Sequence, residues 1–206
     1  SLESIAGAVM QSAIVGLEFG PQAHVHIVPR WSSKTRQLEA EFQIGYKGYI
    51  ELGDRTGRIA FTMPEIVYED DKFDYQYGSN MFLHHKPNIE SEKYGDPQYA
   101  KYYYTYLRFK DGTDRFIVRT KQQMINHMDR FAPRNKEKRI VGPWVSDFDS
   151  MALKTTIHQL FKTVSISSDF ANKISRDGTI ANDPDNPRSF HDYIDVEAEE
   201  TEEQAG

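Results

Sequence analysis

The amino-acid sequence predicts an α+β fold: an N-terminal helix, a β-hairpin, a helix, antiparallel strands, and then a long C-terminal helix with one or two shorter helices. Three observations support this prediction. Apolar residues recur at helical spacing at the start of the chain, alternating and aromatic-rich segments fill its middle, and helix-start signals return after residue 120. Strands that are grouped in the sequence, and not interleaved with helices, are typical of this architecture.

The sequence pattern of the first quarter of the chain predicts a helix, a hairpin and a second helix. Leu2, Ile5 and Val9 begin an amphipathic helical pattern that ends at Gly16, and a turn separates the two alternating segments that follow. Gly57 suits the left-handed position that commonly ends a helix. The predicted elements are a helix over residues 2–17, strands over residues 23–31 and 38–44, and a helix over residues 47–56.

Antiparallel strands are predicted for the middle of the chain. Asp111 and Gly112 form a strong two-residue hairpin signal between two apolar runs. Pro64 indicates a bulge or an edge strand, because proline cannot donate a hydrogen bond to a neighbouring strand. The predicted strands are residues 58–68, 73–77, 81–85, 99–109 and 113–119, with a polar loop over residues 87–97.

Helices are predicted again towards the end of the chain. Thr120 is a cap residue ahead of a helix that reaches residue 130. Pro143 suits the first position of a long helix over residues 143–161, and a short helix follows over residues 168–175. Apolar residues line two sides of the long helix, so that it is either enclosed in the core or packed on a second subunit.

The length and charge of the chain predict one core domain and a tail. The 206 residues suffice for a single core domain, which we place at residues 1–178 ahead of an acidic, disordered tail over residues 179–206. Residues 183–206 contain nine acids and one base, a net charge of −8, which leaves +2 for the rest. Such a tail limits the binding of an anionic partner, or is simply a solvated terminus. Because the chain starts at Ser1 and not at a methionine, we expect an N-terminal part of the natural protein to be missing.

The composition argues against several functional classes. The absence of cysteine excludes disulfides and cysteine-ligated zinc. The sequence also contains no run of about 18 apolar residues, which a membrane-spanning helix would need. Phosphate-loop, His-Glu-x-x-His and Gly-x-Ser-x-Gly motifs are also absent. We therefore predict no catalytic residue, no metal site and no cofactor. A metal-dependent nuclease built on Glu69, Asp70 and Asp71 is an alternative, although these acids equally suit a turn between strands.

Basic and aromatic residues are interleaved in several segments, and this mixture suits single-stranded nucleic acid. Within residues 43–52, Tyr46 and Lys47 lie between two glycines, so that a ring, a cation and a closely approachable backbone share one turn. Further basic groups lie within residues 108–121 and 130–139. An ordinary connecting turn and ordinary surface charge are the alternative interpretations of these segments.

From about residue 16 to residue 175 the chain resembles the RecT family of phage single-strand DNA annealing proteins. The resemblance rests on the joint order and spacing of short blocks, none of which is decisive alone. The blocks are GLEFG at 16–20, VHIVP at 25–29, QIGYKGYIEL at 43–52, RTG at 55–57, KDG at 110–112, RTKQQ at 119–123, GPW at 142–144 and MALKT at 151–155. The chain departs from the family pattern at His158 and Gln159, where relatives often carry basic residues, and residues 68–99 are hard to align.

The resemblance implies an ATP-independent protein that coats single-stranded DNA and anneals it to its complement, which yields duplex. It implies a homo-oligomer, either a ring or a helical filament, that holds DNA in a basic groove and works beside a phage exonuclease in the cytoplasm of a bacterial host. Lys47, Lys121 and Lys154 match basic positions of the family, and Lys162 follows on the same helix. The predicted DNA-binding residues are Tyr46, Lys47, Tyr49, Arg55, Lys110, Arg115, Arg119, Lys121, Lys154 and Lys162.

A structural assembly protein, such as a phage scaffold, is the alternative from another class. Its basic segments would contact other subunits in place of DNA, and its oligomers would be indifferent to oligonucleotides. The nuclease alternative instead predicts that strands are shortened when a divalent metal is present.

Overall fold

The structure is a computed structural model. The described residues are 1–22, 24–32, 35–164 and 167–178. They confirm the α+β fold class, with the predicted order of helices and antiparallel strands. The acidic tail predicted over residues 179–206 lies outside the described residues. No helix in the described part of the chain is both long and apolar enough to span a membrane.

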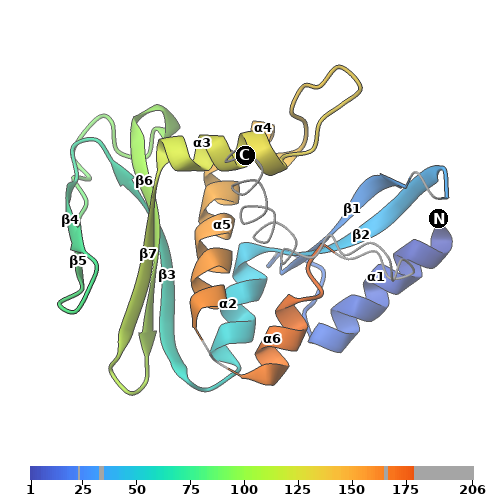
Figure 1. The fold of residues 1–206 in the computed structure, drawn as a ribbon, viewed down its shortest axis with the longest axis horizontal. Coiled ribbons are helices and arrows are strands. Elements are labelled where there is room, and N and C mark those ends of the chain that lie inside the picture. Colours follow the sequence, from blue (N-terminus) through green and yellow to red (C-terminus); the bar gives the residue numbers. More distant parts are fainter. Residues whose placement is uncertain (23, 33–34, 165–166, 179–206) are drawn as a thin grey trace, which may run out of the picture. The chain divides into compact units, whose positions relative to one another are not determined.

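Two compact units make up the chain (Figure 1). The first unit combines Ser1–Thr56 with Ile166–Gly206, and the second unit is Gly57–Ser165. The single core domain over residues 1–178 stays a prediction.

The first unit is built on one antiparallel hairpin. Its strands pair in register from Val25 opposite Ile44 to Ser32 opposite Gln37. The helix α1 packs against β2, and α2 contacts α6 (Figure 1). The elements of the first unit are α1 (Leu2–Val15), β1 (Val25–Ser32), β2 (Gln37–Ile44), α2 (Tyr46–Asp54) and α6 (Ser168–Ile174).

The helix α1 buries its small side chains and exposes its large apolar ones. The buried residues are Ser4, Ala8, Ser12 and Val15. The exposed ones are Leu2, Ile5, Val9, Met10 and Ile14. Ser4 explains this orientation in part, because its hydroxyl accepts a hydrogen bond from the Ala40 backbone N–H at 2.9 Å. A surface helix ordinarily turns its large apolar side to the core, so the apolar pattern in the sequence located this helix but not its buried face.

The start of α2 crosses the start of β1 at close range. The Gly45 backbone N–H donates to the His24 carbonyl oxygen at 2.8 Å. One turn into the helix, a β-carbon on Gly48 would lie 2.3 Å from that same oxygen and 2.9 Å from Ile44 Cγ2. Only glycine fits at position 48, because the obstacle is a backbone atom that is already held by a hydrogen bond.

Asp177 joins three segments of the first unit. One of its carboxylate oxygens accepts from the Ile44 backbone N–H at 2.6 Å, and the other accepts from the Tyr49 hydroxyl at 2.6 Å. The neighbouring Gly178 N–H donates to the Phe42 carbonyl at 2.9 Å. Burial, reinforced by Asp177, raises the pKa of Tyr49 well above its usual value, so the hydroxyl remains a donor. The segment after α6 therefore closes the core of this unit.

The second unit contains a three-stranded antiparallel sheet in the order β3–β6–β7, and a separate β4–β5 hairpin. Figure 1 shows α5 on one side of the sheet and the β4–β5 hairpin on the other. The elements of the second unit are β3 (Ile59–Tyr68), β4 (Lys72–Gln76), β5 (Phe82–Lys86), the 3-10 helix η1 (Pro97–Tyr99), β6 (Ala100–Phe109), β7 (Asp114–Thr120), α3 (Lys121–Phe131), α4 (Pro143–Ser146) and α5 (Phe148–Thr163).

Aromatic side chains fill the space between the sheet and the β4–β5 hairpin. Phe73 on β4 stacks with Tyr104 on β6, with ring centroids 5.7 Å apart. His85 on β5 lies edge-on to both rings. The core behind them is formed by Val67, Tyr104, Phe116 and Val118. The hairpin covers one end of this sheet face and leaves Phe61 and Met63, at the other end of β3, 40% and 41% exposed.

The opposite face of the sheet holds α5 through polar pairs, which we call the helix–sheet seam. The pairs are Tyr103–Asp149 (2.5 Å), Thr105–Thr156 (2.9 Å) and Arg119–Gln159 (2.9 Å). Burial, together with the hydrogen bond to Asp149, raises the pKa of Tyr103, so its hydroxyl donates at any ordinary pH. Ala152 packs between these pairs against Tyr103 and Met124.

One expectation about the helices needs correction, and two about a strand and a helix cap are confirmed. The long helix predicted from Pro143 is interrupted: Asp147, at φ −152°, ends α4, and its carboxylate caps α5 by accepting from the Ser150 N–H. Asp and Asn are strong N-cap residues, and this signal inside the predicted helix was overlooked. Pro64 lies on an edge strand as expected, with the register shifts of β3 at its two ends. Thr120 caps α3 as predicted, in a reciprocal capping box with Gln123.

Replacing Gly48 with alanine should destabilise the first unit. Alanine ordinarily favours a helix interior over glycine, but here the clash with the His24 carbonyl outweighs that gain, and we expect a net loss of about 1–3 kcal/mol. Urea unfolding followed by circular dichroism measures it. The matched control is Lys47→Ala, an exposed neighbour in the same helix, which should change stability by less than about 0.5 kcal/mol. A G48A chain as stable as K47A would contradict the close approach of α2 to β1.

Candidate nucleic-acid interface

The ten predicted DNA-binding residues are divided between the two units. Four lie in or directly after α2 of the first unit, namely Tyr46, Lys47, Tyr49 and Arg55. Six lie in the second unit, namely Lys110, Arg115, Arg119, Lys121, Lys154 and Lys162. The structure gives them unequal access to a ligand.

In the first unit, Lys47 offers the clearest ligand contact. It is exposed on the first turn of α2, where the backbone N–H groups of the helix start also favour an anion. Tyr46 is half-buried beside it. Tyr49 is fully buried and bonded to Asp177, so its ring offers no face to a base. Arg55 donates to Glu51 at 2.7 Å and to the Gly16 carbonyl, which gives it a role in holding α1.

In the second unit, Lys110 and Arg115 are exposed at the β6–β7 turn. Asp111 closes the turn by accepting from the backbone and hydroxyl of Thr113, and these hydrogen bonds lower its pKa. Arg58, at the start of β3, is exposed at the same end of the sheet, with its guanidinium 5.9 Å from the Phe109 ring centroid. This end of the sheet therefore carries several cations on a closed, well-formed turn.

In this structure the side chains of Arg119 and Lys121 are hydrogen-bonded to other groups of the protein. Arg119 donates to Gln159 across the helix–sheet seam and to the Val118 carbonyl. Lys121 Nζ donates to the carbonyl oxygens of Pro97 and Gln98, at 2.7 and 3.1 Å, and so fixes η1 beside α3. Both side chains are half-buried. Each would have to exchange a protein partner for a phosphate in order to bind DNA directly.

Lys154 and Lys162 lie on α5, eight residues apart, and both are half-buried. Lys162 lies in the last turn of the helix, where a cation is favoured by the helix dipole. The seam sets the rotation of α5 on the sheet, and thereby the direction in which these lysines leave the helix.

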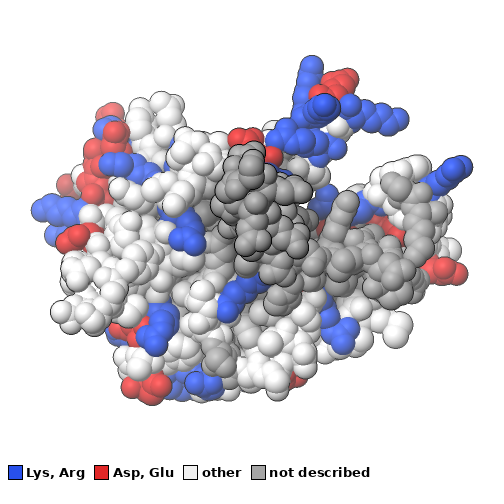
Figure 2. Space-filling view, in the orientation of Figure 1, with Lys and Arg blue, Asp and Glu red and all other residues white. Residues whose placement is uncertain are grey.

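A basic loop between α3 and α4 is the most cationic surface in the second unit. Figure 2 shows its Lys and Arg side chains projecting beyond the rest of the unit. The exposed cations of this loop are Arg134, Lys136, Lys138 and Arg139, against one acid, Glu137. The loop has internal order: Arg134 donates to the carbonyls of Lys138 and Asp129, and a backbone bridge joins Arg134 to Ile140. The sequence indicated this basic segment but not the hydrogen bonds that order it.

Three side chains that were not among the predicted contacts form an aromatic–arginine group, in which Phe61 and Arg108 are exposed and Tyr106 is half-buried. Phe61 and Tyr106 stack with centroids 6.0 Å apart and planes at 21°, and the Arg108 guanidinium lies 5.7 Å from both centroids. Facing positions on β3 and β6 bring them together, since Phe61 pairs with Arg108 and Met63 with Tyr106. Strand alternation in the sequence could have revealed this grouping once the pairing of β3 with β6 was known.

Each of the acids that suggested a nuclease is bonded to a basic side chain of the protein. Glu69 and Asp70 both accept from Lys93, at 2.9 and 3.2 Å. Asp71 is buried against His85, at 3.0 Å. Burial alone would raise the pKa of Asp71, but hydrogen bonds from two backbone N–H groups and from His85 lower it. The described residues contain no group of three or more potential metal ligands.

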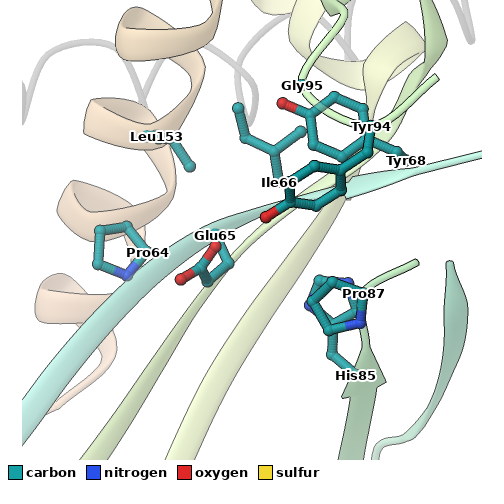
Figure 3. A pocket seen from close by; sticks show the side chains of 9 residues that line it. All are labelled: Pro64, Glu65, Ile66, Tyr68, His85, Pro87, Tyr94, Gly95 and Leu153. Atoms are coloured by element: carbon teal, nitrogen blue, oxygen red, sulfur yellow. The ribbon is translucent and has the colours of Figure 1, made fainter. Parts of the chain in front are cut away.

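A pocket of about 240 Å³ lies between β3, the segment before η1 and α5 (Figure 3). Its lining residues are Pro64, Glu65, Ile66, Tyr68, His85, Pro87, Tyr94, Gly95 and Leu153. Tyr68 and Tyr94 meet edge-on in this lining, with centroids 5.3 Å apart. None of the ten predicted DNA-binding residues lines this pocket, and we assign it no part in nucleic-acid binding.

Comparison with known proteins supplies an independent line of argument. A sequence model described as the RecT family matches residues 1–190. The chain is 31% identical to Protein RecT of Escherichia coli (strain K12) over 179 residues, which is 84% of this chain and 62% of that protein. It is 30% identical to Uncharacterized protein YqaK of Bacillus subtilis (strain 168) over 119 residues, 58% of this chain and 38% of that protein. The chain thus spans less than two thirds of the length of either relative.

Removing two cations from the basic loop tests whether it touches nucleic acid. For the double variant Lys136→Ala with Arg139→Ala, we expect weaker binding of a single-stranded oligonucleotide. The slope of log K against log salt should fall by about 0.7 for each lost phosphate contact. Fluorescence anisotropy across a salt series measures both quantities. The matched control is Glu137→Gln on the same loop, which should bind as tightly as the parent or more tightly. An unchanged slope in the double variant would remove this loop from the interface.

Proposed function

This chain belongs to the RecT family, and we propose that it binds single-stranded DNA and anneals complementary strands without ATP in phage-type homologous recombination. The observation that carries the proposal is the family match over residues 1–190, which includes every basic segment described above. We propose no covalent chemistry for it and no cofactor.

The mechanism that we propose is electrostatic holding followed by base pairing. Lys47, the cations at the β6–β7 turn and the basic loop neutralise phosphates, with Lys154 and Lys162 contributing from α5. Bound counterions are released as these contacts form, so affinity falls with salt. A strand that is held extended has already lost much of its conformational entropy, which lowers the cost of finding register with its complement. The chemistry of pairing is then supplied by the bases.

Assembly into a ring or a helical filament is part of this proposal. The exposed apolar side of α1, from Leu2 at 86% exposure to Ile14 at 50%, supports it, because an unshielded apolar helix face is a common subunit contact. The cellular setting of the proposal is the cytoplasm of a bacterial host, with an exonuclease that exposes the strand. The same apolar face is the observation that favours a structural assembly protein as the second candidate.

Annealing of two labelled complementary oligonucleotides, without ATP, tests the proposed function. We expect the protein to accelerate duplex formation, the acceleration to fade as salt rises, and both strands to remain intact with magnesium or with a chelator. Gel analysis separates duplex from shortened strands.

The alternatives give different outcomes in the same experiment. Oligomers that form equally well with and without oligonucleotide, and no acceleration at any salt, would contradict annealing and favour the assembly protein. Metal-dependent shortening of the strands would contradict it in favour of the nuclease.

A further inference from the structure

We propose that Phe61, Tyr106 and Arg108 form a platform on which the bases of single-stranded DNA stack. The inference rests on the proposed function. It states that the sheet face on which the β4–β5 hairpin packs contacts the bases of DNA and not only its phosphates. It also explains why aromatic and cationic side chains share the end of this sheet.

The platform is open to a ligand. The β4–β5 hairpin covers the aromatic residues at one end of this sheet face and stops short of the other. Phe61 remains 40% exposed, next to Met63 at 41%. Tyr106 beside it is half-buried, and Arg108 is exposed. Large aromatic rings are normally withdrawn from water, and an exposed ring on a strand surface offers flat area on which a base can stack.

The platform is also held rigid before any ligand arrives. Arg108 donates to both carboxylate oxygens of Asp114, with Nε–Oδ1 at 2.7 Å and Nη2–Oδ2 at 2.9 Å. Nη2 donates in addition to the Tyr106 hydroxyl at 2.9 Å. The ion pair lowers the pKa of Asp114. The guanidinium plane is therefore fixed beside both rings, and a base that stacks there loses little additional side-chain entropy.

The charge around the platform identifies the class of ligand. Lys110, Arg115 and Arg58 are exposed at the same end of the sheet, while the acids there, Asp111 and Asp114, are bonded to Thr113 and Arg108. An apolar protein segment would gain nothing from these cations. A single strand needs both features, because its phosphates seek cations and its bases seek rings.

Double-stranded DNA fits this surface less well, since its bases are stacked on one another and offer no free face. The platform therefore selects for unpaired bases. In an annealing protein it would hold a strand until its complement withdraws the bases into a duplex.

The test compares two oligonucleotides of equal length, one of thymidines and one whose sugars carry no base. Phe61→Leu removes the ring but keeps an apolar side chain. We expect the parent protein to bind the thymidine strand more tightly than the abasic one, and F61L to lose about fivefold or more on the thymidine strand alone. The salt slope should stay unchanged, because no phosphate contact is removed. Tyr94→Leu, at a ring that is 43% exposed but away from the platform, is the matched control and should bind both strands like the parent.

The F61L variant could also lose affinity because it misfolds, so a second measurement uses the unaltered protein. Oligonucleotides that contain 5-iododeoxyuridine should cross-link to Phe61 or Tyr106 in the unaltered protein, as mass spectrometry of the peptides would show. If F61L lost affinity equally for the thymidine and the abasic strand, or if the cross-links were confined to other peptides, the proposed platform would be overturned. A shift in oligomer size with unchanged DNA affinity in F61L would assign the surface to protein contact instead. If the unaltered protein binds neither strand, the proposed function itself fails, and this outcome is distinct from a failure of the platform.

Discussion

The hydrogen-bonded seam between α5 and the three-stranded sheet is the constraint on which the second unit depends. Tyr103, Thr105 and Thr156 are fully buried members of it, whereas Asp149, Arg119 and Gln159 are half-buried. A buried donor or acceptor that loses its partner costs about 1–3 kcal/mol. Thr105 and Thr156 are both fully buried, and the Thr156 hydroxyl also donates to the Leu153 carbonyl, so Thr105 is the donor within the pair. An apolar contact would allow the helix to rotate or slide, whereas this one fixes its register. The directions of Lys154 and Lys162 follow from it.

Several cations of the described residues fall into two groups with different roles. Arg55, Arg119 and Lys121 hold parts of their own unit together through carbonyl or side-chain acceptors. Lys47, Lys110 and the cations of the basic loop are carried on the surface by well-formed turns or helix starts. A family resemblance compares residue types and cannot distinguish these duties. We propose the second group as phosphate contacts, because its side chains are exposed, and the aromatic–arginine group as a contact for bases.

Local signals in the sequence predicted the elements well, while the choice of faces required the structure. Caps and turns act over a few residues, so Thr120, Gly16 and the Asp111–Gly112 turn marked their boundaries correctly. The buried face of α1 was missed because Ser4 and Ser12 are buried through hydrogen bonds, which hydropathy does not register. Tyr49 looked available in a basic segment, yet its partner Asp177 lies 128 residues away. The aromatic–arginine group likewise depends on strand pairing over more than 40 residues.

Lysine labelling with and without a saturating single strand tests most directly the claim that selected surface cations hold DNA. Acetylation followed by mass spectrometry reports the access of reagent to each lysine. The account predicts that the strand protects Lys47, Lys110 and Lys136, and that it leaves Lys72 and Lys86 on the β4–β5 hairpin as reactive as before. Protection of the hairpin lysines with full reactivity at the β6–β7 turn and the basic loop would contradict it.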